Sequence, residues 1–229
     1  MKSVSVPVIY EDNHLLVVEK PVNVPVQADS SGDPDMLTLL KAYIGEKYNK
    51  QGNVYLGLVH RLDRPVGGVM IFARTSKAAS RMAKFFRRNE VGKTYHAVVC
   101  TGAKRPPGRG TLVHWLQKNT ATNTVRAFDH PHDTAKKAVL DYQMLSFDPG
   151  RQRALMKIHL HTGRAHQIRV QFAASGMPLW GDQRYNPDKA VPGQQIALHA
   201  TVLHFQHPVK KEPMEFSLEL PHKEPWIFL

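Results

Sequence analysis

The chain of 229 residues contains a single cysteine, Cys100. One cysteine excludes an internal disulfide framework and argues against a cysteine-based zinc site. It lies at the end of the apolar run YHAVVC, where a small core residue in a reducing, intracellular environment is expected. The sequence also lacks an apolar run of membrane-spanning length, and Pro7, Glu11 and Asp12 interrupt the N-terminal stretch before a secretory signal forms. We therefore predict a cytoplasmic protein with no membrane partner.

Acidic residues are scarce relative to basic ones. Lys and Arg number 31 against 19 Asp and Glu, which gives a formal net charge of +12 and a pI of about 9.9. The basic residues are spread along the chain and not gathered in a tail, which favours a shaped basic surface. A polyanionic partner, nucleic acid first, is predicted. The alternative is a generally basic, well-solvated protein with no role in nucleic-acid binding.

The sequence shows no internal repeat, low-complexity segment or Pro/Ser/Gly-rich linker, so a single domain over residues 1–229 is predicted. Hairpin-like strands mix with isolated helices, and regular βαβ units do not occur. This pattern indicates an α+β fold with a mixed, mostly antiparallel sheet, flanking helices and a central basic cleft. Strands are expected at 5–10, 14–20, 54–59, 69–73, 93–100, 111–118, 124–128, 138–147, 154–161, 196–205 and 214–220.

Three helices are expected, at residues 33–48, 76–89 and 164–176. Asp33 is predicted to cap the first, with Pro34 in its first turn. Ser76 is predicted to cap the second, whose basic residues face outward. The third begins at Arg164 and ends at Gly176.

A polar insert, HRLDR, lies between the predicted strands at 54–59 and 69–73. Loops displayed by a rigid scaffold often carry catalytic residues, which makes Asp63 a candidate. The alternative is that Asp63 only pairs with Arg61 or Arg64 to close a turn.

Arg164 is badly placed at the start of a helix, because the helix dipole favours an anion there. A carboxylate should compensate, and Asp63 is the obvious candidate. Tyr95 alternates with apolar neighbours on its strand, so it is either a core residue or a platform on which a base stacks.

Four blocks of the sequence resemble a known family. HRLDRPVGGVMIFARTSKAA resembles the signature around the catalytic Asp of the RluA-type pseudouridine synthases, and GRAHQIRVQFAASGMPLWGDQRY resembles their second signature. IYEDNHLLVVEKP and IALHATVLHFQHP are similar to two further blocks, in the same order along the chain. The resemblance covers almost the whole chain.

The resemblance implies isomerisation of uridine to pseudouridine in structured RNA, rRNA or tRNA, without cofactor or metal. Asp63 matches the catalytic Asp, and Tyr95 matches the Tyr that stacks on the target uracil. Arg164 matches the basic partner of the carboxylate, and Arg61 matches the Arg that replaces the flipped base. Leu198 lies in the block that supplies an apolar contact near the uracil. A monomer with no obligatory protein partner is predicted.

The sequence departs from the family pattern at a few positions. Val66, Gly67 and Gly68 replace the more common Thr-Ser-Gly, Ala165 replaces Thr, and Met177 stands where His is frequent. These changes bear on the choice of RNA more than on the chemistry. The small RNA-binding S4 module of many relatives is not found in the sequence, so RNA recognition is expected from the catalytic domain itself.

The chemistry is consistent with these residues. The reaction needs one carboxylate, as nucleophile or general base, in a closed pocket, and a uridine that has left its stack. The alternatives are a non-catalytic RNA-binding protein on the same fold, a metal enzyme and a DNA-binding module. The metal enzyme is suggested by three pairs of histidines, which lack a carboxylate in ligand-like spacing. The pairs are His130 and His132, His159 and His161, and His204 and His207. No helix-turn-helix or zinc-finger pattern supports DNA binding.

Overall fold

The computed structural model describes residues 5–228 and divides the chain into two compact units. The first unit consists of the chain up to Gly92 together with Ala200–Leu218. The second consists of Lys93–His199 and the chain from Glu219 onward. The prediction of one catalytic domain over the whole chain stays a prediction.

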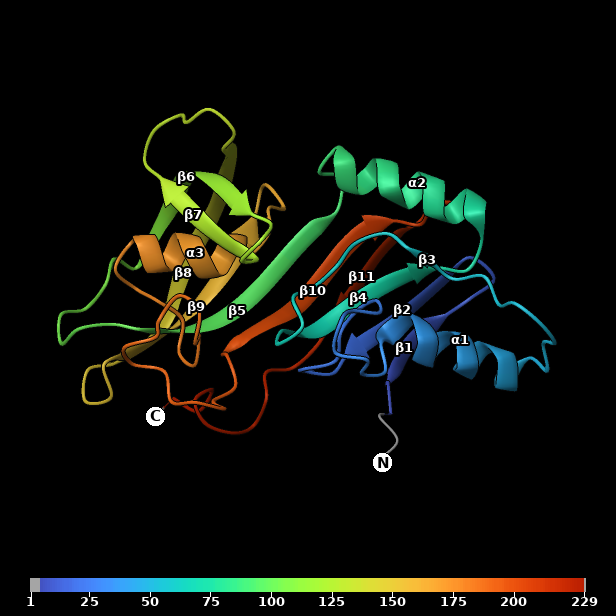
Figure 1. The fold of residues 1–229 in the computed structure, drawn as a ribbon, viewed down its shortest axis with the longest axis horizontal. Coiled ribbons are helices and arrows are strands. Elements are labelled where there is room, and N and C mark those ends of the chain that lie inside the picture. Colours follow the sequence, from blue (N-terminus) through green and yellow to red (C-terminus); the bar gives the residue numbers. More distant parts are fainter. Residues whose placement is uncertain (1–4, 229) are drawn as a thin grey trace. The chain divides into compact units, whose positions relative to one another are not determined.

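The first unit is built on a mixed, mostly antiparallel sheet (Figure 1). Its strands follow the order β1-β2-β4-β10, with β3 paired to β4 and β11 paired to β10. The strands are β1 (Val8–Glu11), β2 (Leu15–Lys20), β3 (Gly57–Leu58), β4 (Gly67–Ala73), β10 (Leu198–Gln206) and β11 (Pro213–Ser217). Every residue of β4 is buried, which a central strand covered on both faces requires.

Two helices belong to this unit, α1 (Met36–Lys47) and α2 (Ser76–Arg87). Ala78 and Met82 of α2 pack into a core with apolar residues of β2, β4 and β10. The predicted caps are both wrong by one or two residues. The side chain of Asp35, not Asp33, accepts from the first turn of α1, and Thr75 caps α2 in place of Ser76. Each cap is the polar residue that directly precedes the first helical residue.

The strand predicted at residues 54–59 is wrong in extent. Only Gly57 and Leu58 form β3, and both are only partly buried. Tyr55 is 49% exposed, so this segment passes along the surface before it pairs with the end of β4. The strand predicted at 69–73 is confirmed as part of β4.

The second unit contains five antiparallel strands in the order β5-β9-β8-β6-β7. They are β5 (Gly92–Cys100), β6 (Arg109–Asn119), β7 (Thr124–Phe128), β8 (Lys136–Asp148) and β9 (Arg153–Leu160). The helix α3 (Gln167–Ala174) packs on this sheet through Val170, against Leu116, Val125 and Ala138 (Figure 1). The C-terminal tail adds a smaller cluster in which Trp226 and Phe228 lie beside buried residues.

The predicted α+β class is confirmed, because residues 5–228 form three helices together with mostly antiparallel strands. Within residues 5–228, no helix is long and apolar enough to cross a membrane.

Candidate active site

The loop that carries Asp63 connects β3 to β4 in the first unit. The backbone N–H of Val66 donates to the carbonyl oxygen of Asp63 at 2.9 Å, which closes a turn. Leu62 and Val66 point inward, with exposed fractions of 8% and 2%. Asp63 is partly buried and Arg61 is exposed. Two apolar anchors therefore hold the loop, with the partly exposed Asp63 between them and the exposed Arg61 directly before them.

A buried lysine lies beneath this loop. Lys20, the last residue of β2, is 1% exposed, and its ammonium donates to the carbonyl oxygens of Pro21, Arg64 and Val66 at 3.0, 2.9 and 2.8 Å. Burial lowers the pKa of Lys20 to about 7, although the nearby carboxylate of Asp63 opposes this shift. We did not predict Lys20 from the sequence. Its signal is a lysine that ends the apolar run LLVVEK.

Arg64 is tied to a different part of the first unit. Its guanidinium forms ion pairs with Asp29 and Asp33, and its Nε donates to the carbonyl oxygen of Asn23 at 3.1 Å. These contacts anchor the loop to the segment before α1. Asp33, predicted as a helix cap, is instead a partner of Arg64.

His60 secures the other end of the loop. Its Nε2 accepts from the backbone N–H of Ile71 at 3.0 Å, and its ring stacks on Phe86 with centroids 4.6 Å apart. Because the ring nitrogen accepts from a strand and the ring face lies on α2, the backbone that leads into Asp63 is fixed on both sides.

Gly68, which keeps the glycine of the Thr-Ser-Gly pattern, has a steric role in the first unit. Its φ is +125°, and a Cβ placed there would lie 2.2 Å from the carbonyl oxygen of Ala200. Only glycine fits a position with this backbone conformation and this close an approach.

Tyr95 and Leu198 belong to the second unit. Tyr95 lies on β5 and is 9% exposed, and Leu198 begins β10 and is 5% exposed. Both side chains are largely buried. This burial is compatible with an apolar rim that receives the face of a base, and it is equally compatible with an ordinary core.

The third predicted helix begins later than expected. α3 starts at Gln167, and Arg164 lies in the preceding loop. The side chain of Gln167 organises this loop: its Oε1 accepts from the Arg164 backbone N–H at 3.0 Å and from the Thr162 hydroxyl at 2.8 Å. The Arg164 side chain is exposed, and its Nε donates to the carbonyl oxygen of Lys137 at 3.1 Å. The helix-dipole argument for Arg164 is therefore wrong.

A second arginine of the same motif is buried. Arg169 is 7% exposed and makes two hydrogen bonds of 2.8 Å to the carboxylate of Asp182. Its guanidinium lies over the ring of Tyr185, whose hydroxyl is 2.7 Å from Nδ1 of His166. We did not single out Arg169 from the sequence, because its helical spacing says nothing of a partner thirteen residues further along the chain.

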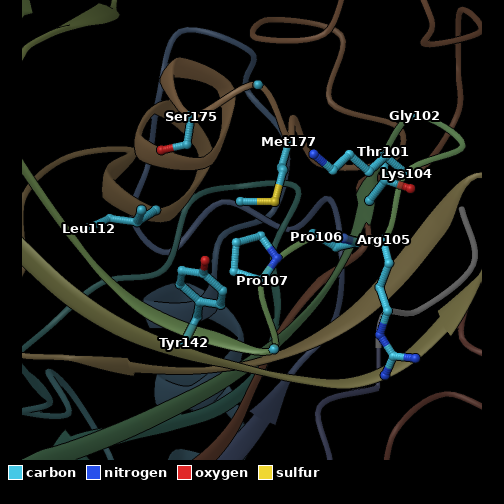
Figure 2. A pocket seen from close by; sticks show the side chains of 12 residues that line it. Thr101, Gly102, Lys104, Arg105, Pro106, Pro107, Leu112, Tyr142, Ser175 and Met177 are labelled. Atoms are coloured by element: carbon cyan, nitrogen blue, oxygen red, sulfur yellow. The ribbon is translucent and has the colours of Figure 1, made fainter.

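A hollow of about 840 Å³ lies elsewhere in the second unit, at the loop between β5 and β6 (Figure 2). Figure 2 shows Pro107, Tyr142 and Met177 around this space. None of the five predicted site residues lines it. Throughout residues 5–228, no group of three His, Cys, Asp or Glu residues is arranged to hold a metal ion.

Comparison with known proteins gives consistent results. The sequence profile of the family described as RNA pseudouridylate synthase matches residues 14–174. The chain is 29% identical over 237 residues to a protein of Zymomonas mobilis named ribosomal large subunit pseudouridine synthase D, covering 99% of this chain and 73% of that protein. It is 31% identical to an RNA pseudouridine synthase of Aquifex aeolicus, covering 96% of this chain and 71% of the relative.

The fold is also similar to that of a solved structure. Human RNA pseudouridylate synthase domain containing 1 superposes with a TM-score of 0.75 at 23% identity, over 96% of this chain and 87% of the human one. The profile match over more than half of the sequence and the similar relatives show that the chain belongs to the RNA pseudouridylate synthase family and is an enzyme that isomerises uridine in RNA.

Proposed function

We propose that Asp63 supplies the carboxylate for this isomerisation, with large-subunit ribosomal RNA as the first substrate to test and tRNA as the second. The name of the Zymomonas mobilis relative supports ribosomal RNA. The observation that best supports the role of Asp63 is the Lys20 ammonium. It holds the carbonyl groups of Arg64 and Val66, and it lies within electrostatic range of the Asp63 carboxylate.

The reaction breaks the bond between N1 of uracil and C1′ of ribose and joins C5 to C1′. C5 loses a proton and N1 gains one, so the atoms balance without a redox partner. A carboxylate acts here either as a nucleophile or as a general base. Both routes start from an ionised Asp63 held in a defined orientation, which the anchored loop supports.

An ionised carboxylate in a site that excludes water needs a cationic partner. The resemblance assigns this role to Arg164, and we keep it as a proposal. Arg169 is buried, but its guanidinium is already paired with the carboxylate of Asp182.

The remaining roles are those that the family resemblance implies, and the burial of Tyr95 and Leu198 and the exposure of Arg61 are compatible with them. Tyr95 offers a ring for stacking on uracil and Leu198 offers an apolar contact, while the exposed Arg61 is available to fill the gap left by a flipped base. We further propose that the protein acts in the cytoplasm as a monomer, with no obligatory protein partner and no cofactor.

The test is single-turnover pseudouridine formation on large-subunit ribosomal RNA isolated from a strain that lacks the gene. Asp63→Asn keeps the shape of the side chain and removes the carboxylate. It should abolish turnover while RNA binding and the melting temperature stay close to those of the wild type. Asp133→Asn, in an exposed loop, is the matched control and should react normally. Turnover by an Asp63→Asn protein verified by mass to be free of deamidation would overturn the proposal.

A further inference from the structure

Lys93 is a buried cation that the functions assigned above do not use. It is the second residue of β5 and is 7% exposed. Strand alternation places it on the same face as Tyr95. Its Nζ lies 3.8 Å from the point that a Cβ on Gly163 would occupy, so the ammonium lies against the loop that carries Arg164.

The Lys93 ammonium lacks a counter-charge. Among residues 5–228, no carboxylate and no hydrogen-bond acceptor contacts it. Burial lowers the pKa of Lys93. Burial, His161 and Lys93 lower the pKa of His159, and the carboxylate of Asp141, which is paired with His161, opposes them. The exposed Arg164 adds a second cation to the loop beside Lys93.

Lys20 provides an internal comparison. It is also buried, and three carbonyl oxygens accept from its ammonium. A buried cation without such partners is unfavourable for the fold, so Lys93 is unexplained by the stability of the chain alone. The Lys93 Nζ is not fully enclosed, in contrast to His199 Nε2, which is enclosed and has no hydrogen-bond partner. The ammonium is thus within reach of a ligand.

We propose that Lys93 binds a backbone phosphate of the RNA, that of the target uridine, at the Gly163 side of the second unit. The assignment rests on the proposed stacking of the uracil on Tyr95. Residues two apart on a strand are separated by about 6.6 Å, which lies within the span of a single nucleotide. Phosphate is the anion that RNA presents everywhere along its chain. Its negative charge supplies the counter-charge that Lys93 lacks in the RNA-free protein.

Lys93→Met tests this proposal, because it keeps the length of the side chain and removes the charge. We expect the melting temperature of the RNA-free protein to stay the same or rise, since an unpaired buried charge is removed. Affinity for an oligouridylate of about twelve nucleotides should fall about tenfold, the loss of one charge-assisted hydrogen bond. The slope of log affinity against log salt should flatten by about 0.7, the value for one phosphate on a single strand.

Replacing one phosphate with a neutral methylphosphonate locates the contact. At one position of the oligouridylate the replacement should weaken binding to the wild type and have no further effect on Lys93→Met. Lys118→Met, exposed on β6, is the control and should respond to the replacement as the wild type does. Because the assay measures binding alone, it separates this proposal from the role of Asp63 in turnover.

Gly163→Asp provides a second, independent variant. Its φ is not in the left-handed region and its Cβ would make an ordinary contact, so a carboxylate can reach the ammonium. We expect a higher melting temperature and weaker RNA binding, with both effects absent in the Lys93→Met background. Unchanged affinity and salt slope in Lys93→Met would overturn the proposal. A fall in its melting temperature, or failure to fold, would equally overturn it by making Lys93 a structural residue.

Discussion

The Lys20 ammonium donates a hydrogen bond of 2.9 Å to the carbonyl oxygen of Arg64, directly after Asp63 in the chain. A second bond, of 2.8 Å, reaches Val66. The end of β2 and the loop before β4 are thereby joined by one buried side chain. The orientation of the Asp63 backbone depends on a residue more than forty positions earlier.

Lys20→Met should destabilise the protein by about 3 kcal/mol, because it leaves buried carbonyl oxygens without a donor. Turnover should fall more than RNA affinity, because the loop that carries Asp63 loses its support. Chemical denaturation and single-turnover assays measure both effects. Lys84→Met on the exposed side of α2 is the control. A Lys20→Met protein as stable and active as the wild type would contradict this role.

The pH dependence of the free energy of unfolding should reveal the lowered pKa of Lys20. Its pKa is about 7 in the folded protein and 10.5 in the unfolded chain. Between these values the unfolded state binds more protons, so the free energy of unfolding should rise as pH increases from 7 to 10.5. The measurement is the difference between wild type and Lys20→Met in denaturation at pH values across this window. A difference that is constant or shrinks with pH would argue against the shift.

Tyr95→Phe keeps the ring and removes the hydroxyl. If Tyr95 acts only as a stacking platform, turnover and RNA affinity should both be retained, whereas a role in proton transfer should reduce turnover alone. Tyr95→Ala should lose binding and about 3 kcal/mol of stability, because a buried aromatic side chain is truncated. Tyr142→Phe, also buried in the second unit, is the control for loss of a hydroxyl.

Replacing each of the two arginines of the GRAHQIR motif should have different effects on the stability of the protein. Arg164→Ala should leave the melting temperature unchanged because the side chain is exposed, and should weaken RNA binding. Arg169→Ala should cost about 3–5 kcal/mol, because it leaves the buried carboxylate of Asp182 unpaired. Single-turnover assays at a temperature where both variants are folded should show the larger loss of turnover in Arg164→Ala. Unchanged turnover in Arg164→Ala would contradict the assignment from the resemblance.

Gly68→Ala should destabilise the protein by about 3 kcal/mol or more, since a Cβ would meet the backbone of Ala200 in a conformation that suits only glycine. Gly102→Ala is the control, because nothing lies within 4 Å of a Cβ there. Thermal melts of the two variants make the comparison. A tolerated Gly68→Ala would mean that β4 and β10 can move apart at this point.

The sequence by itself determined the α+β class and most strands, because alternating or continuous apolar residues depend only on which faces are buried. It also determined the family, since the polar motifs are contiguous in the chain. The prediction was weaker at element ends. The start of α3 at Gln167 follows from hydrogen bonds between the Gln167 side chain and the loop before it, which residue spacing does not encode.

Only the tertiary structure decided which polar residues are buried and what they contact. The contacts of Lys20 with the Asp63 loop, of Arg64 with Asp33, and of Arg169 with Asp182 join residues far apart in the sequence. Burial of a charge depends on the sum of all surrounding segments, so the apolar run that Lys20 ends does not by itself show that Lys20 is buried, and no local pattern distinguishes Lys93 from a lysine on the surface. The partners of a buried charge are a property of the packed fold, and they determine how the Asp63 loop is held.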